Sequence, residues 1–316
     1  MIIVTLILLW LSAFIDPGTQ AATIYESEPM PLYVIMKLMT GANVHAGLIF
    51  TFLLLIFVLF LLVNFNTSVF FLGERTFFPA ILYVLFSALL PFLQVRNPVL
   101  PAIVFLMLAL KRIMESYRKP GTAFNFFDAA IFISTGSLFY ANLIWFGVLV
   151  FIGIVLLRSG NIIEIISSLI GLATPYILLF GIYYVLGKDL EILISGIKEN
   201  LFTALPEVSF TRIEIVVLVF TGLMILVSIV FLLQHIHTRK IKSRKTFYLL
   251  LWVFVISVVL YIVLPSASAE MLWIGSIPLT YILSHYFLFV RKKIIPEIFF
   301  TGFFLLIFLI QAFRIF

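Results

Sequence analysis

Cysteine is absent from this 316-residue chain, and charged side chains make up only 11% of it. Without cysteine the protein can form no disulfide framework, no thiolate metal site and no cysteine nucleophile. A soluble domain carries about a quarter charged residues, whereas here 64% of the residues are hydrophobic. The composition therefore predicts an integral membrane protein and excludes redox chemistry by thiols.

Signatures of soluble catalytic and nucleotide-binding proteins are also missing. The sequence contains no Walker loop, no dinucleotide-binding glycine motif and no nucleophile elbow with a histidine partner. His235 and His237 lie two residues apart, so on a helix they point in different directions and make a poor metal site. The basic residues sit in short runs beside apolar segments, a pattern that indicates membrane lipids as partners and not nucleic acid.

Continuous apolar segments predict an all-α, polytopic membrane protein with about eleven transmembrane helices, in a range of ten to twelve. A span needs roughly 20 apolar residues, so residues 1–316 form a single transmembrane domain with no sizeable soluble part. The first segment is expected to be a retained helix, with a signal peptide as the alternative. The predicted helices cover 1–15, 44–65, 77–93, 98–117, 124–140, 143–157, 162–186, 213–234, 247–264, 271–290 and 294–313.

The distribution of lysine and arginine predicts the orientation of these helices. With successive loops on opposite sides, fourteen basic residues fall on one side and six on the other. The fourteen are Arg75, Lys111, Arg112, Arg118, Lys119, Arg158, Arg239, Lys240, Lys242, Arg244, Lys245, Arg291, Lys292 and Lys293. We therefore expect a bacterial inner-membrane protein with a cytoplasmic N-terminus and a C-terminus on the outer, periplasmic side.

Two outer loops are long enough to hold structure of their own. The first, 16–43, contains a stretch at 31–39 with apolar residues at helical spacing, which predicts a short helix lying in the membrane interface. The second, 187–211, has an amphipathic pattern with Leu190, Ile194 and Ile197 on one face. Little other polypeptide lies outside the predicted spans.

Acids near the predicted spans have a structural explanation. Asp128, Glu164, Glu214 and Glu297 all lie within a turn or two of a helix start, where the helix dipole and nearby water favour a carboxylate. His285 is the most deeply placed titratable residue, and we expect a hydrogen-bonded structural histidine there in preference to a proton relay. The scarcity of charge inside the spans disfavours an ion-coupled transporter.

The first outer loop holds the best candidates for chemistry. Asp16 lies where the first helix leaves the membrane, so it can serve as a general base, or it can simply end that helix before Pro-Gly. Glu26 and Glu28 have the residue types that hold a divalent cation or a substrate hydroxyl, although acidic pairs in solvated loops are common. Arg96, together with Lys37, lies at the level of lipid phosphates; snorkelling to the interface is the alternative.

The layout of the N-terminal half resembles a known enzyme class. A first helix that ends in Asp16, an acidic outer loop with an interfacial helix, the segment 75–120 and a tight helical hairpin resemble the first half of GT-C-class membrane glycosyltransferases. This likeness covers roughly residues 1–186. The whole chain also resembles a family of polytopic inner-membrane proteins from Bacteroidota-type bacteria.

The GT-C resemblance implies a sugar transfer from a polyprenyl-phosphate donor at the outer face. Asp16 then matches the catalytic acid, Glu28 assists it or binds a metal with Glu26, and Arg96 lies nearest the donor phosphate. The chain departs from the class in having no paired acid beside Asp16 and no C-terminal soluble domain. Two alternatives remain: a non-catalytic, degenerate GT-C-like subunit of a larger envelope complex with other membrane proteins, and a transporter of lipid or small molecules.

Overall fold

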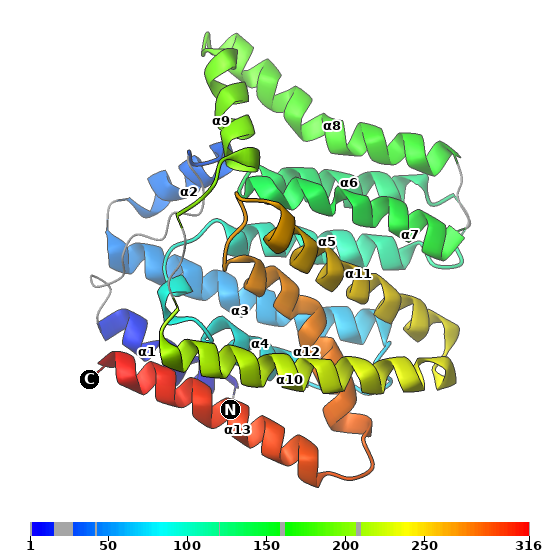
Figure 1. Cartoon of the computed structure of the whole chain (residues 1–316). Helices are drawn as coiled ribbons and strands as arrows, with labels where there is room; N and C mark the ends of the chain where they lie inside the picture. Colours follow the sequence, from blue (N-terminus) through cyan, green and yellow to red (C-terminus); the bar gives the residue numbers. More distant parts are fainter. Residues whose placement is uncertain are drawn as a thin grey trace.

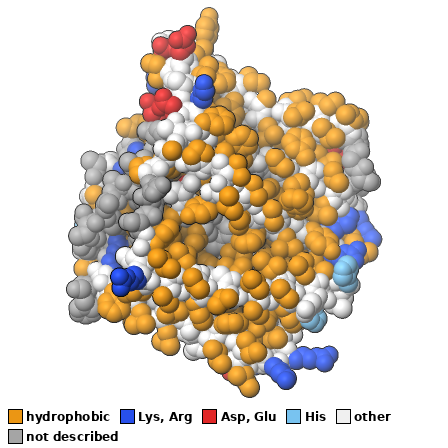
Figure 2. All heavy atoms as spheres, viewed as in Figure 1, with side chains coloured by type: hydrophobic (Ala, Val, Ile, Leu, Met, Phe, Trp, Pro, Cys, Tyr) orange, Lys and Arg blue, Asp and Glu red, His pale blue; other side chains and the backbone are white. Residues whose placement is uncertain are grey.

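The computed structural model describes residues 2–15, 28–41, 43–119, 121–158, 162–206 and 210–315. This part of the chain is helical and contains no β-strand. Most of the helices run along one common direction, whereas α9 stands across them at one edge of the bundle (Figure 1). Hydrophobic side chains cover most of the face shown in Figure 2.

The elements follow one another with short connections. Their bounds are α1 Ile2–Ile15, α2 Pro31–Thr40, α3 Val44–Val69, α4 Phe78–Ser87, η1 Pro91–Leu93, α5 Val99–Glu115, α6 Ala123–Ser137, η2 Ala141–Gly147, α7 Val148–Arg158, α8 Ile162–Val185, α9 Leu190–Phe202, α10 Arg212–His235, η3 Ile236–Thr238, α11 Ile241–Val263, α12 Met271–Phe289 and α13 Ile294–Ile315.

Six helices are long and apolar enough to cross a membrane: α3, α8, α10 with η3, α11, α12 and α13. Four shorter apolar segments accompany them: α1, α2, α4 and the segment formed by η2 and α7. The prediction of an all-α chain is confirmed for the described residues, and these long apolar helices indicate a multi-pass membrane protein.

Several predicted spans differ in detail from the observed helices. The predicted span 77–93 is interrupted after Ser87, and the chain continues through the short helix η1, which starts at Pro91. Proline removes a backbone donor and its ring crowds the preceding turn, so a continuous helix across this point is disfavoured. The predicted span 247–264 instead begins earlier, at Ile241, because the basic residues before 247 extend the helix.

The short helices of the two long loops were predicted with different success. The helix expected at 31–39 is α2. In the second loop α9 forms, but the predicted apolar face is only partly right, since Ile194 is exposed while Leu193, Gly196 and Asn200 are buried. The buried face of α9 includes a small and a polar residue, so the spacing of its apolar residues alone does not predict that face.

Helix α12 lies at the centre of the bundle, packed against α4, α10 and α11. It is the least apolar of the six long helices, yet it is the most completely buried. Its hydroxyl groups donate to carbonyls of the same helix, as Ser276 does to Trp273 O at 2.8 Å and Ser284 to Thr280 O at 2.6 Å. Polar side chains satisfied in this way can be enclosed by protein within a membrane.

Helix α8 lies against α6 at one side of the bundle (Figure 1). Its Glu164, predicted to be a helix-start acid, accepts a hydrogen bond of 2.7 Å from the Thr122 hydroxyl of the connection before α6. Further along, the Ser134 hydroxyl donates to Leu172 O at 2.6 Å. A Cβ atom at Gly171 would lie 2.6 Å from Phe127 O, so the two backbones approach too closely there for any side chain.

The helix connections gather at two opposite ends of the bundle. At one end, which we call the basic end, the connections 70–77, 116–119, 236–240 and 290–293 meet. There the Arg239 guanidinium lies 3.8 Å from the Phe289 ring centroid, and the Lys245 ammonium lies 5.7 Å from that of Tyr117. This grouping matches the predicted distribution of basic residues.

The connections 28–41, 88–98, 138–141, 203–206 and 264–270 meet at the opposite end, which we call the far end. Tyr33 donates to Arg96 O at 3.3 Å, and the amide of Leu205 donates to Pro265 O at 3.1 Å. The C-terminal helix also finishes here, since Arg314 donates to Pro91 O at 2.9 Å. The described connections therefore fall into two groups at opposite ends of the bundle; their sides of the membrane stay a prediction.

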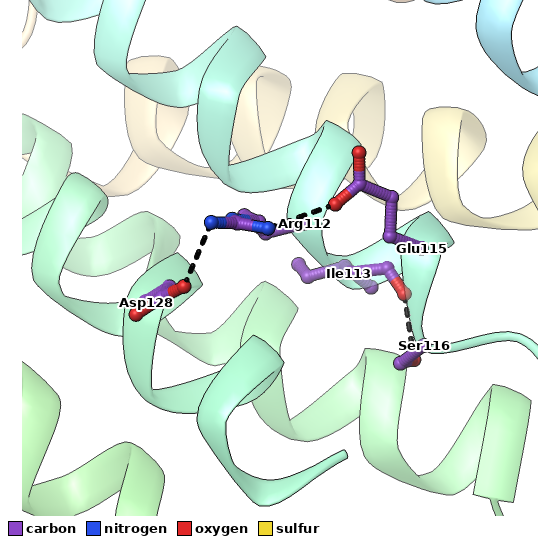
Figure 3. A network of polar contacts seen from close by, with 5 residues as sticks. All are labelled: Arg112, Ile113, Glu115, Ser116 and Asp128. Atoms are coloured by element: carbon purple, nitrogen blue, oxygen red, sulfur yellow. Dashed lines mark hydrogen bonds and ion pairs between the residues drawn. The ribbon is translucent and has the colours of Figure 1, made fainter. Parts of the chain in front are cut away.

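An ion-pair network at the basic end includes Asp128, which the sequence analysis placed near a helix start. Arg112 of α5 lies 3.1 Å from Asp128 of α6 and 3.1 Å from Glu115 of its own helix (Figure 3). These side chains are between 31% and 43% exposed, so each pair stabilises the fold by only about 0–1 kcal/mol. Asp128 joins two neighbouring helices here, and this pairing supports the structural explanation.

Candidate functional site

Of the residues predicted for chemistry, the structure describes Glu28, Lys37 and Arg96, which lie at the far end. Asp16 and Glu26 lie outside the described residues. The backbone of Glu28 is held by the Asn200 side chain of α9, which accepts from the Glu28 amide at 3.0 Å and donates to its carbonyl at 2.6 Å. The exposed Glu28 side chain rests against Gly196, which also belongs to α9.

Both predicted basic residues are associated with α2: Lys37 belongs to this helix, and Arg96 of the connection before α5 binds its end. Arg96 donates to the Thr40 hydroxyl and to Gly41 O, both at 2.9 Å, at the C-terminal end of that helix. The Lys37 ammonium lies 4.6 Å from the ring centroid of Tyr33, whose hydroxyl donates to Arg96 O. A cation at a helix C-terminus is electrostatically favourable, so part of the Arg96 binding capacity is used in holding α2.

Arg96 and Lys37 are therefore both held at α2, whereas the backbone of Glu28 is anchored on α9. Glu28 precedes the start of α2, whereas Arg96 binds its last turn, and a ten-residue helix is about 15 Å long. Among the described residues, no cluster of three or more histidine, aspartate or glutamate side chains is placed to hold a metal ion. The catalytic, phosphate-binding and metal-binding roles of these residues stay predictions.

An apolar groove lies between α10, α11 and α12. It has a volume of about 410 Å³. Its wall includes Leu218 of α10, Phe254 and Val258 of α11, and Gly275 and Leu279 of α12. Apolar residues of α10 and α11 also face outward from the bundle, so the groove lies beside the space that lipid chains occupy in a membrane. We call it the lateral groove.

A second, more polar cavity continues the lateral groove at the far end. It has a volume of about 520 Å³ and is bordered by residues 204–206, 261–265 and 267–269. Phe210, Tyr261, Ile262 and Ala269 border both cavities. The lateral groove therefore leads to a polar mouth at the far end.

A buried carboxyl group is adjacent in the chain to residues that border this mouth. Glu270 is 3% exposed, and its Oε1 accepts hydrogen bonds from the Tyr140 hydroxyl at 2.8 Å and from the Ser268 amide at 2.9 Å. Burial raises the pKa of Glu270, an effect that these hydrogen bonds partly oppose. The neighbours Ser268 and Ala269 border the polar mouth, and Ala269 and Met271 border the lateral groove.

The Glu270 carboxyl belongs to a wider polar cluster. Asn142 donates to Ser266 O at 2.9 Å, and the Ser266 hydroxyl donates to Leu201 O at 2.8 Å. These bonds join η2, the end of α9 and the connection between α11 and α12. The cluster anchors the connection 264–270, whose residues 267–269 border the polar mouth.

Sequence reasoning missed this cluster. Glu270 has no local signature of a buried acid, because its partner Tyr140 is 130 positions away along the chain. The signal that could have drawn attention was the run Ser266-Ala267-Ser268-Ala269-Glu270, in which small polar residues separate two apolar helices. The apolar groove itself leaves no local pattern, since its residues look like any others that face lipid.

His285 in α12 departs from expectation. Its ring is fully buried, and neither ring nitrogen has a hydrogen-bond partner in the described part of the chain. The ring packs instead against Phe231, Phe247 and Phe289, with centroid distances of 5.8, 5.2 and 5.2 Å. The prediction of a hydrogen-bonded histidine is wrong for this structure.

A buried polar group without partners costs stability, so His285→Phe is expected to raise the free energy of unfolding by about 1–3 kcal/mol. Thermal unfolding of the purified protein in detergent measures this change. His285→Ala serves as the control, because it also removes the nitrogens but leaves a cavity that costs about 2–4 kcal/mol. A less stable phenylalanine variant would show that the imidazole has a polar role.

Comparison of the chain with protein-family models, with curated proteins and with solved structures gives no match.

Proposed function

We propose that this chain is a multi-pass bacterial inner-membrane protein of about eleven spans that binds a long-chain lipid in the lateral groove. The hydrocarbon part lies between α10, α11 and α12, and the polar head lies at the mouth near Glu270. The observation that carries the proposal is the continuity of an apolar groove with a polar mouth through four shared residues. Their volumes lie within the range of ligand sites.

The orientation follows from charge. The basic end carries most of the lysine and arginine residues in the connections, and such residues stay in the cytoplasm. The far end, with the polar mouth, α2 and α9, then faces the periplasm, as does the C-terminus. In this orientation the lipid head is presented in the outer leaflet.

For the chemistry we keep the GT-C-like proposal as the more specific form of lipid binding. The donor is then a sugar on a polyprenyl phosphate, with its isoprenoid chain in the lateral groove. Asp16 and Glu28 act on the acceptor or a divalent cation, Glu26 adds a cation ligand, and Arg96 with Lys37 meets phosphate. Support comes from the placing of Arg96 and Lys37 at the same end of the bundle as the polar mouth.

A non-catalytic, lipid-binding subunit of an envelope complex is the second proposal. It is favoured by the hydrogen bonds that already engage Glu270 and Arg96 within the fold. A transporter has less support, because such proteins commonly use broken helices at mid-membrane. Here α8 and α12 continue through Pro175 and Pro278.

Filling the lateral groove is expected to remove the bound lipid. Val258 borders the groove, so Val258→Trp should reduce the lipid retained by the purified protein at least about tenfold, which corresponds to about 1.4 kcal/mol of binding free energy. Native mass spectrometry from a mild detergent measures the retained lipid and its mass. The neighbouring residue Val259 is 48% exposed and does not border the groove, which makes Val259→Trp the matched control.

The identity of the retained lipid separates the two forms of the proposal. A polyprenyl-phosphate sugar supports transfer chemistry, whereas phospholipid alone supports the non-catalytic subunit. Equal lipid retention by wild type, Val258→Trp and Val259→Trp would overturn the lateral groove as the binding site.

A further inference from the structure

A separate cavity lies at the basic end, opposite the polar mouth. It has a volume of about 610 Å³ and lies between the end of α10, the end of α12 and the start of α13. Its apolar wall is formed by Phe231, Tyr286, Phe289, Val290 and Ile295. Since these elements are the ends of three long apolar helices, the cavity is at the level where lipid chains meet their headgroups.

Three basic or titratable side chains border this cavity. They are His235, Arg291 and Lys292, and all three are exposed. The guanidinium of Arg239 is a further cation near the cavity, since it lies 3.8 Å from the ring centroid of Phe289 in the cavity wall. Exposed cations grouped at an apolar wall attract an anionic headgroup more strongly than a zwitterionic one.

The backbone at this cavity also favours an anion. The 22-residue helix α13 begins next to it, and a helix N-terminus carries partial positive charge. The last carbonyls of α12, which would repel an anion, are engaged by the Lys293 ammonium, which donates to Phe287 O at 3.0 Å and Leu288 O at 2.9 Å. Glu297 in the first turn of α13 opposes this field, but the surrounding cations outnumber it.

We propose that this cavity binds an anionic phospholipid, with its phosphate at Arg291 and Lys292 and an acyl chain along Tyr286 and Ile295. The apolar wall selects a lipid over free phosphate, because an inorganic ion gains nothing from it. This site is distinct from the lateral groove and lies at the other end of the bundle, so it does not depend on the function proposed above.

The test compares lipid binding by two double variants, each of which removes two positive charges, one inside the cavity and one outside it. Arg291→Gln with Lys292→Gln removes the proposed phosphate ligands. Arg118→Gln with Lys119→Gln removes an exposed Arg–Lys pair at the same end but outside the cavity. Native mass spectrometry of delipidated protein titrated with phosphatidylglycerol, or with phosphatidylcholine, gives the affinities.

Wild type and the Arg118/Lys119 variant are expected to bind phosphatidylglycerol equally and at least about tenfold more tightly than phosphatidylcholine. The Arg291/Lys292 variant should lose this preference. Ile295→Trp, which crowds the apolar wall without a change of charge, should also weaken phosphatidylglycerol binding, and millimolar inorganic phosphate should not displace the lipid.

Equal losses of phosphatidylglycerol affinity in the two double variants would overturn the proposal. They would show that the lipid is attracted by the overall charge of the basic end and not by this cavity. Displacement of the lipid by inorganic phosphate alone, or full affinity in Ile295→Trp, would overturn the role of the apolar wall. Thermal unfolding with and without phosphatidylglycerol provides a second readout, since a ligand that binds the folded state raises its stability.

Discussion

Gly171→Ala is expected to loosen α8 from α6 and to lower the free energy of unfolding by about 1–3 kcal/mol. The added Cβ would lie 2.6 Å from Phe127 O and 2.8 Å from the Ala130 Cβ, so the backbones must move apart. This movement also stretches the neighbouring hydrogen bond from Ser134 to Leu172 O. Thermal unfolding in detergent measures the loss.

Gly181→Ala in the same helix is the matched control. Nothing lies within 4 Å of a Cβ atom at Gly181, and alanine favours a helix over glycine by about 1 kcal/mol. We therefore expect this variant to be as stable as wild type or slightly more stable. A similar loss in both variants would mean that the close helix crossing at Gly171 does not hold α8 in place.

Glu270→Ala is expected to destabilise the far end by about 1–3 kcal/mol. The change removes a buried acceptor of the Tyr140 hydroxyl and of the part-buried Ser268 amide, and the loss of a buried hydrogen-bond partner costs about 1–3 kcal/mol. Glu270→Gln is the control, because its side-chain carbonyl can still accept both hydrogen bonds. Unfolding experiments on the three proteins at pH 5 give the comparison.

The same residue makes stability depend on pH. Burial raises the pKa of Glu270 in the folded protein above its value in the unfolded chain. Its contribution is therefore fully present below the ordinary glutamate pKa and is lost as the pH rises through the raised folded value. Since glutamine does not ionise, Glu270→Gln should gain stability relative to wild type as the pH rises. A constant difference between the two proteins across this range would contradict the assignment.

The cap formed by Thr211 and Glu214 is a feature that the local sequence predicts, whereas the burial of Glu270 is not. Glu214, predicted to be a helix-start acid, accepts from the Thr211 amide at 2.8 Å, while the Glu214 amide donates to the Thr211 hydroxyl. Both partners lie within one turn, so the sequence contains all the information. Glu270 is also an acid near a helix start, but its partner Tyr140 comes from a distant element, and only the packing of the bundle makes it a buried group.

The sequence alone determined that the chain is helical, that several segments are long and apolar, and that its basic residues divide between two sets of connections. These features follow from local composition and spacing, which fix helix formation and the preferred solvent of each segment. The low charge that first distinguished the chain remains its clearest signal. The tertiary structure decided which helix is central, where α8 crosses α6, and where the lateral groove meets its polar mouth. Such features arise from residues far apart in sequence, whose contacts depend on how whole helices pack.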